Sequence, residues 1–336
     1  MVGDVRQVRN STSQIGYHYS GCDGKLKMMP QNPIDGWRRR VVANTTGLFA
    51  HAEDPLVNTL DYRGDPGLFG PGSITWEVMG DPATFVGGIR ALMVQAAHPE
   101  VVAGVKDHST YRTDPLGRLS RTSNYVTATS YGAMPEVEAA LAEVRRAHRP
   151  VKGRSHRDVA YSAGTARFGA WVHNSLTDSF LAANQAYGRR KLDAEEADRF
   201  VAEQAEIGRL MRADPLPLTA AELSAWVADH PDVGPSPGMV EAMAFLESPP
   251  LDPLVKAGYA VLAKAAVAII PERLRGILDL TPVPGARALG ASSTAFLRWA
   301  LGSSPRWRVS LIRVGAEVPE HMFKQKAPFE EAKRSA

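Results

Sequence analysis

Apolar residues recur at helical spacing along almost the whole chain, and this periodicity is the strongest constraint on its fold. In the segment GDPATFVGGIRALMVQAAHPE, five apolar residues share one helix face: Phe85, Ile89, Leu92, Met93 and Ala96. Asp81 is a suitable N-cap, Pro82 suits the first helical position and Pro99 ends the pattern. No segment alternates between apolar and polar residues as a half-buried strand does. The sequence therefore predicts an all-α fold.

Two adjacent glycines, Gly87 and Gly88, lie inside this predicted helix. Each glycine costs a helix about 1 kcal/mol relative to alanine. Two explanations remain open at this point: the close approach of a neighbouring helix, or space for a flat ligand.

A polar row follows in the segment HSTYRTDPLGRLSRTSNYV, which predicts a helix after Pro115. Arg118, Arg121 and Thr122 stand at positions i, i+3 and i+4, so they share one face, and Tyr125 continues the row. In one interpretation the arginines are solvated and the threonine bonds back to its own helix. In the other, the row faces an anion, a cofactor or a substrate.

The next predicted helix, in MPEVEAALAEVRRAHRPVKG, ends its apolar row on a histidine. Val137, Leu141 and Val144 are followed on the same face by His148, whose imidazole is therefore expected to point inward. A buried neutral imidazole needs a partner for its nitrogens. That partner is either a hydrogen-bonding group in the core or a metal such as iron.

Three further histidines are less informative. His98 lies at a helix end before Pro99, which favours a structural or capping role. His173, beside Trp171, is either a core residue or part of a pocket wall. His108 is expected to belong to a turn network.

Composition narrows the class of protein. The net charge is only +3 and the basic residues are scattered, so a nucleic-acid partner is not expected. The single cysteine, Cys22, permits no intrachain disulfide and no CxxCH haem attachment, which fits a cytoplasmic protein. The N-terminus lacks the apolar region of a secretory signal. The most apolar stretch, residues 254–270, contains two lysines and is too short to span a membrane, although peripheral membrane contact remains open.

Neither a repeat nor a break in composition divides the chain. We expect a weakly ordered N-terminal arm over residues 1–40, a single helical domain over 41–320 and a flexible tail over 321–336. The common catalytic motifs HExxH, GxSxG, GxGxxG and the P-loop are absent.

Three segments, in this order, resemble the rubber oxygenase family. They are GDPATFVGGIRALMVQAAHPEVVAGVKDHSTYRTDPLGRLSRT, VRRAHRPVKG and WVHNSLTDS, and the resemblance extends over roughly residues 60–300. The family includes the latex-clearing proteins, the oxygenase of mycophenolic acid biosynthesis and many bacterial proteins of the DUF2236 type. The motifs are specific to this superfamily but not to a substrate.

The resemblance implies a globin-like helical core with additional helices and one non-covalent haem b. The axial histidine of the family matches His148. Its distal motif Arg-x-x-Lys-Thr matches residues 118–122, which gives Arg118, Arg121 and Thr122 catalytic roles on the distal side. Arg121 replaces the lysine, and because a guanidinium does not deprotonate, a lysine-ligated closed state is not expected here.

The expected function is therefore that of a haem b-dependent oxidoreductase, either an oxygenase or a dehydrogenase. It would act on an apolar small molecule, with O₂ or a peroxide bound opposite the axial His148. Rubber is disfavoured as the substrate, because the sequence shows no secretion signal and lacks the distal lysine. Two alternatives remain, a non-catalytic haem or gas-binding protein and a haem-free helical scaffold.

Overall fold

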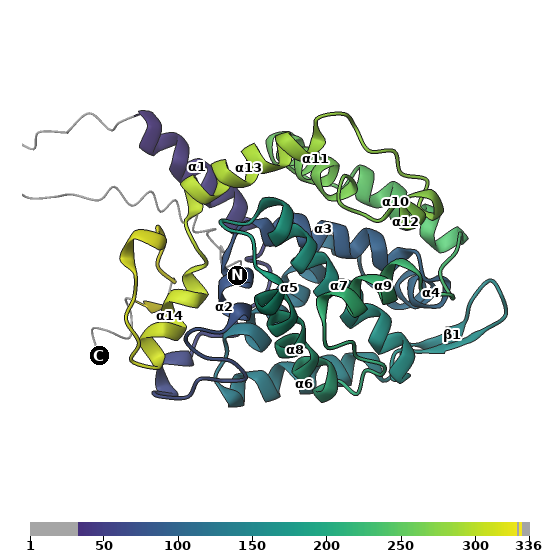
Figure 1. Ribbon diagram of the computed structural model, residues 1–336, viewed down its shortest axis with the longest axis horizontal. Helices are drawn as coiled ribbons and strands as arrows, with labels where there is room; N and C mark the ends of the chain where they lie inside the picture. The colour runs from purple at the N-terminus through teal and green to yellow at the C-terminus, as the bar shows by residue number, and fades with distance from the viewer. Residues whose placement is uncertain (1–32, 328, 331–336) are drawn as a thin grey trace, which may run out of the picture.

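The computed structural model describes residues 33–327, 329 and 330, and most of these residues are helical (Figure 1). Within this part of the chain the all-α fold is confirmed, with one short strand pair as its sheet. The elements, in chain order, are α1 (Pro33–Gly47), η1 (Thr59–Asp61), α2 (Ile74–Gly80), α3 (Ala83–Ala96), α4 (Pro99–His108), α5 (Pro115–Tyr131), α6 (Met134–His148), β1 (Lys152–Arg154), β2 (Ala160–Ser162), α7 (Ala166–Tyr187), α8 (Ala194–Leu210), α9 (Ala220–Ala228), α10 (Pro237–Glu247), α11 (Pro253–Val267), α12 (Glu272–Ile277), α13 (Ala286–Leu301), α14 (Pro305–Arg313) and η2 (Glu320–Met322).

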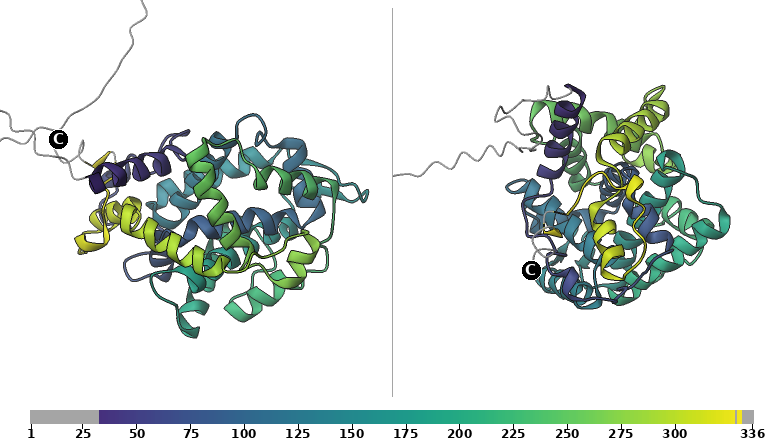
Figure 2. Two further views of the ribbon diagram at one scale, coloured as in Figure 1. Left: turned by 90° about the horizontal axis from the view of Figure 1, so that it is seen from above. Right: turned by 90° about the vertical axis from the view of Figure 1, so that its left-hand side faces the viewer.

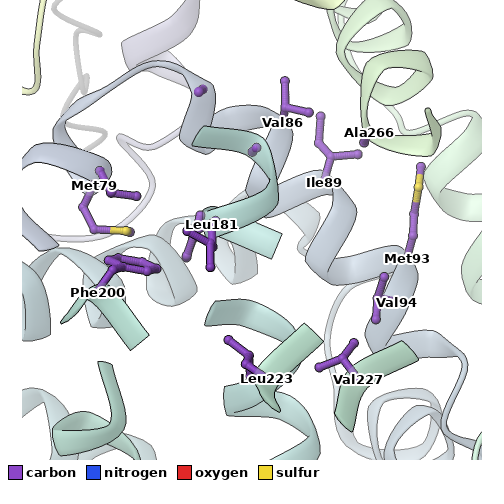
Figure 3. Packing of buried hydrophobic residues seen from close by; sticks show 14 of the residues in the cluster. Met79, Val86, Ile89, Met93, Val94, Leu181, Phe200, Leu223, Val227 and Ala266 are labelled. Atoms are coloured by element: carbon purple, nitrogen blue, oxygen red, sulfur yellow. The ribbon is translucent and has the colours of Figure 1, made fainter. Parts of the chain in front are cut away.

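Helices α3 and α7 pack along each other in the middle of the molecule, and the other helices are arranged around this pair (Figures 1 and 2). Helix α11 contacts a second side of α3, whereas α8 and α9 contact α7. The close view in Figure 3 shows Ile89 and Met93 of α3 beside Ala266 of α11. Leu181 of α7 lies beside Phe200 of α8 in the same apolar cluster. The central pair thus contributes to one apolar cluster shared with α8 and α11.

A glycine and a buried ion pair explain how closely α3 and α7 approach. A Cβ atom on Gly87 would lie 2.7 Å from the ring of Phe180, so any larger residue would push the helices apart. One turn further along α3, the Arg90 guanidinium pairs with Asp178 at 2.8 Å and donates to the Ser179 hydroxyl at 2.7 Å. Both charged groups are buried, so removal of either one would leave the other as an unpaired buried charge at the helix interface.

Helices α5 and α6 form an antiparallel hairpin that is anchored at its turn. The Glu136 carboxylate accepts hydrogen bonds from the Ala133 amide at 2.8 Å and from the Thr59 hydroxyl at 2.9 Å. Arg313 of α14 donates to the Tyr131 carbonyl at 2.7 Å and to the same Thr59 hydroxyl. These buried contacts fix the turn, while the other end of the hairpin, formed by the start of α5 and the end of α6, is more accessible.

The chain ends differ in part from the expected arm and tail. Residues 33–40 belong to α1, and the rest of the expected arm, residues 1–32, lies outside the described residues. In the expected tail, Phe323 and Glu330 are buried, and Glu330 forms an ion pair with Arg308 of α14. No helix in the described part of the chain is long and apolar enough to cross a membrane. The globin-like arrangement of the core stays a prediction.

Candidate functional site

The residues of the polar row on α5 differ in whether they have partners within the chain. The Arg118 guanidinium makes no hydrogen bond or ion pair with any described residue, and it is partly buried. Burial lowers the pKa of Arg118, and the positive charge of Arg121 lowers it further. The phenol of Tyr125, two turns along, likewise has no described hydrogen-bond partner, and burial raises its pKa. A desolvated cation without a partner is costly, which marks Arg118 as a group that fits an anionic ligand.

Arg121 and Thr122, in contrast, have partners within the chain. Arg121 donates to Asp114 at 3.1 Å and to the Thr110 hydroxyl at 3.2 Å, and its side chain is 48% exposed. Asp114 is also the N-cap of α5, where it accepts from the Gly117 amide at 3.0 Å. The Thr122 hydroxyl donates to the Arg118 carbonyl at 3.0 Å. In this structure Arg121 therefore contacts the N-cap residue of α5, and Thr122 bonds to the backbone of the same helix.

His148 lies on the last turn of α6, at the open end of the hairpin. Burial decreases along its row: Val137 and Leu141 are buried, Val144 is partly buried and His148 is exposed. The expectation of a fully inward imidazole is therefore wrong in this respect, because α6 is tightly packed only near its start. Nevertheless, desolvation by the surrounding atoms lowers the pKa of His148, and so does the positive charge of Arg118.

Helix α3 is mostly buried but has one partly exposed face. A Cβ atom on Gly88 would meet no heavy atom within 4 Å, in contrast to Gly87. Phe85, Leu92 and Gln95 lie on the same face and are also partly exposed. Gln95 donates to the Val172 carbonyl of α7 at 3.1 Å, and Val172 itself is 38% exposed. Gly87 therefore allows close helix packing, whereas Gly88 borders open space, and a flat ligand in that space stays a prediction.

The other histidines occupy different environments. His173 packs against α8, where a Cβ atom on Gly208 would lie 3.0 Å from its ring, and burial lowers its pKa to about 4. This position agrees with a core residue. His108 contacts the Lys152 carbonyl of β1 at 3.2 Å, 44 residues along the chain, and its expected turn network stays a prediction.

Sequence reasoning missed a group that surrounds His98. This residue occupies the N-cap position of α4, but its side chain does not cap the helix. Its ring lies instead beside His230, 5.6 Å away between ring centroids, and Asp232 is also close. The signal in the sequence was the triplet His-Pro-Asp at 230–232, and only the fold brings it next to a histidine 132 residues earlier.

Comparison with known proteins identifies one family for most of the chain. A sequence model described as "ER-bound oxygenase mpaB/B'/Rubber oxygenase, catalytic domain" matches residues 76–300. Searches of curated proteins and of solved structures found no significant match. The matched region contains the polar row of α5, His148 and the central α3–α7 pair. Because the match covers well over half of the chain, the protein belongs to this family of mpaB and rubber oxygenase catalytic domains.

Proposed function

We propose that the chain is a haem b-dependent oxidoreductase that acts on an apolar small molecule, with His148 as the axial ligand of the haem iron. The single observation that carries this proposal is the unpartnered Arg118 guanidinium beside His148 at the open end of the α5–α6 hairpin. The family supports an oxygenase as the kind of enzyme.

His148 has the protonation state and the freedom that a metal ligand needs. Because its pKa is lowered from the ordinary histidine value of 6.5, the imidazole is neutral at pH 7. The described residues form no hydrogen bond with its ring, so a ring nitrogen is available to iron. A bound haem would supply the redox-active iron that activates O₂ or a peroxide. The ring and the cofactor therefore fit each other chemically.

Arg118 is the residue best placed to bind a negative charge near His148. A guanidinium offers several donors in a fixed plane and binds carboxylates and charged oxygen well. It would hold either a propionate of the cofactor or the negative charge that develops on the oxidant. Arg121 and Thr122 keep the catalytic roles implied by the family motif as predictions, and each would have to exchange its present partner to fulfil them.

The expected apolar substrate agrees with the accessible face of α3. Phe85, Gly88 and Leu92 offer an almost entirely apolar surface, and Val172 of α7 adjoins it at the Gln95 contact. Apolar walls with few polar groups are typical of sites for small apolar molecules. The polar groups of the site would then come from α5 and the end of α6.

Haemin titration of two single variants tests the axial assignment. His148→Ala should lose the Soret band that forms in the unaltered chain, whereas His173→Ala should keep it, because His173 packs against α8. A normal spectrum and haem content in His148→Ala would show that another residue ligates the iron.

Oxygen consumption separates an enzyme from a gas-binding protein. The haem-loaded chain, supplied with a chemical reductant and a small isoprenoid, should consume O₂ faster than free haemin at the same concentration and should yield an oxidised isoprenoid product. Stable O₂ binding without consumption would favour the non-catalytic alternative.

A further inference from the structure

Three side chains that bind transition metals converge at the junction of α3 and α4. His98 comes from this junction, and His230 and Asp232 come from the loop between α9 and α10. One potential ligand atom from each residue lies within 4.8 Å of the other two. His98 is only 1% exposed, and its Nδ1 atom has no hydrogen-bond partner. A buried nitrogen in that state is costly unless a further partner binds the group.

Backbone contacts hold the loop in place and leave its two ligand side chains available. The Gly234 amide donates to the Ala97 carbonyl at 2.9 Å, and Arg157 donates to the Asp232 carbonyl at 3.3 Å. Within the described residues, no hydrogen bond reaches the Asp232 carboxylate. The Nδ1 atom of His230 accepts a long hydrogen bond of 3.3 Å from the Asp232 amide, which leaves Nε2 as the ring nitrogen for a metal.

A carboxylate and aromatic rings surround the three residues. Glu100 lies 3.4 Å from the Nδ1 atom of His98 and is held by Ser155 and Arg157. A metal-bound histidine usually directs its second nitrogen toward such a carboxylate, which orients the ring. The rings of Trp171 and Trp226 pack against His230. Two arginines lie nearby: Arg157, whose charge Glu100 balances, and Arg273, which donates to the His230 carbonyl at 3.2 Å.

We propose that His98, His230 and Asp232 form a binding site for one divalent first-row transition-metal cation, separate from the haem site at His148. Two imidazoles and one carboxylate are the donor set that zinc and ferrous iron accept, whereas calcium and magnesium prefer oxygen donors alone. A bound cation would connect the start of α4 to the α9–α10 loop. It would also provide the partner that the Asp232 carboxylate lacks within the described residues.

Metal titration of the full chain tests this site independently of haem. The chelator-treated, haem-free protein is titrated with zinc sulfate by calorimetry, and with ferrous sulfate under nitrogen to distinguish the two cations. We expect one saturable site per chain for at least one of them and no comparable binding of calcium. The same cation should raise the melting temperature.

Single variants of the partly exposed ligands locate the site. Asp232→Asn and His230→Gln should each weaken binding at least tenfold, because each removes one ligand. The matched controls His108→Gln and His148→Ala should bind as tightly as the unaltered chain. The fully buried His98 is not needed for the test, so a folding defect at that position does not affect it. Absence of a one-to-one site, or equal affinity in the ligand and control variants, would overturn the proposal.

Discussion

Two arginines one helical turn apart on α5 illustrate how differently neighbouring residues of one row are used. Arg121 has a carboxylate and a hydroxyl as partners and an exposed side chain. Arg118 is desolvated and has no described partner, and its positive charge lowers the pKa of His148. Surface ion pairs contribute about 0–1 kcal/mol to stability, so Arg121 contributes little to the fold beyond its contact with the N-cap. We therefore propose Arg118 as the residue of this row that binds a ligand.

Replacement of each arginine by glutamine should separate ligand binding from folding. Arg118→Gln should weaken haemin binding by roughly ten- to a hundredfold, since a charged hydrogen bond is worth about 1.5–3 kcal/mol. Its melting temperature should stay within a few degrees, because no described contact is lost. Arg121→Gln, the matched control, should bind haemin nearly as well as the unaltered chain. Equal haemin affinity in all three proteins, measured by absorption titration, would show that Arg118 is a solvated arginine that does not bind the ligand.

The sequence predicted which residues of α5 share a face, but it did not show which of them have partners. Helical spacing is local, so the row from Arg118 to Tyr125 followed from position alone. One partner of Arg121 is Asp114, seven residues earlier, which also caps the helix. The accessibility of His148 depends on where α6 stops packing, which is a tertiary property.

At the scale of elements, Gly87 and Gly88 of the same helix have different surroundings: Gly87 packs against α7, whereas Gly88 borders open space. Both residues lie mid-helix in α3, so both carry the same cost in helix propensity. Only Gly87 faces Phe180 and the backbone of Ser179. The two positions thus form a matched pair that differs in surroundings and not in secondary structure.

Alanine at each glycine should have opposite effects on stability. Gly88→Ala should raise the free energy of unfolding by about 0.5–1 kcal/mol, because alanine favours the helix and its methyl group meets nothing. Gly87→Ala should lower it by about 1–3 kcal/mol, as expected for overpacking at a helix interface. Urea denaturation measures both. A loss of stability in Gly88→Ala equal to that in Gly87→Ala would contradict the presence of open space beside Gly88.

A bulkier residue at the same position tests whether this face adjoins the ligand. Gly88→Phe should fold, because the space is open, but it should reduce haemin or substrate binding if the α3 face lines the site. Unchanged binding of both ligands, with the fold intact by circular dichroism, would show that this face of α3 does not line the site.

At the scale of the whole molecule, buried histidines make stability depend on pH. Burial lowers the pKa of His173 to about 4 in the folded chain, whereas an unfolded histidine titrates near 6.5. Between these values the unfolded chain binds more protons, so stability falls as the pH falls. The contribution of neutral His173 is complete above about pH 6.5 and is lost as the pH falls toward 4.

The variant His173→Gln should therefore flatten part of this dependence. Unfolding in urea at pH 7 and at pH 5 should show a smaller loss of stability in the variant than in the unaltered chain. His108→Gln, which changes an exposed histidine, should leave the loss unchanged. Parallel stability profiles for all three proteins would mean that His173 is not desolvated.

Helical periodicity was sufficient to predict the all-α class and the helix around Phe85, because both depend on local spacing. The helical start at residue 33 escaped prediction, since the segment is polar and its Trp37 packs against Phe296 of α13, far along the chain. The group of His98, His230 and Asp232 escaped for the same reason. Contacts over such distances in sequence follow from the packed molecule and not from local pattern.

Haem content tests the central claim most directly. The protein, produced with a haem precursor and purified, should show a Soret band and contain about one haem per chain by the pyridine haemochrome assay. Acid–butanone should transfer the pigment into the organic phase, because the chain lacks a CxxCH motif for covalent attachment. A folded preparation that shows no Soret band, even after incubation with haemin, would contradict the haem-dependent function.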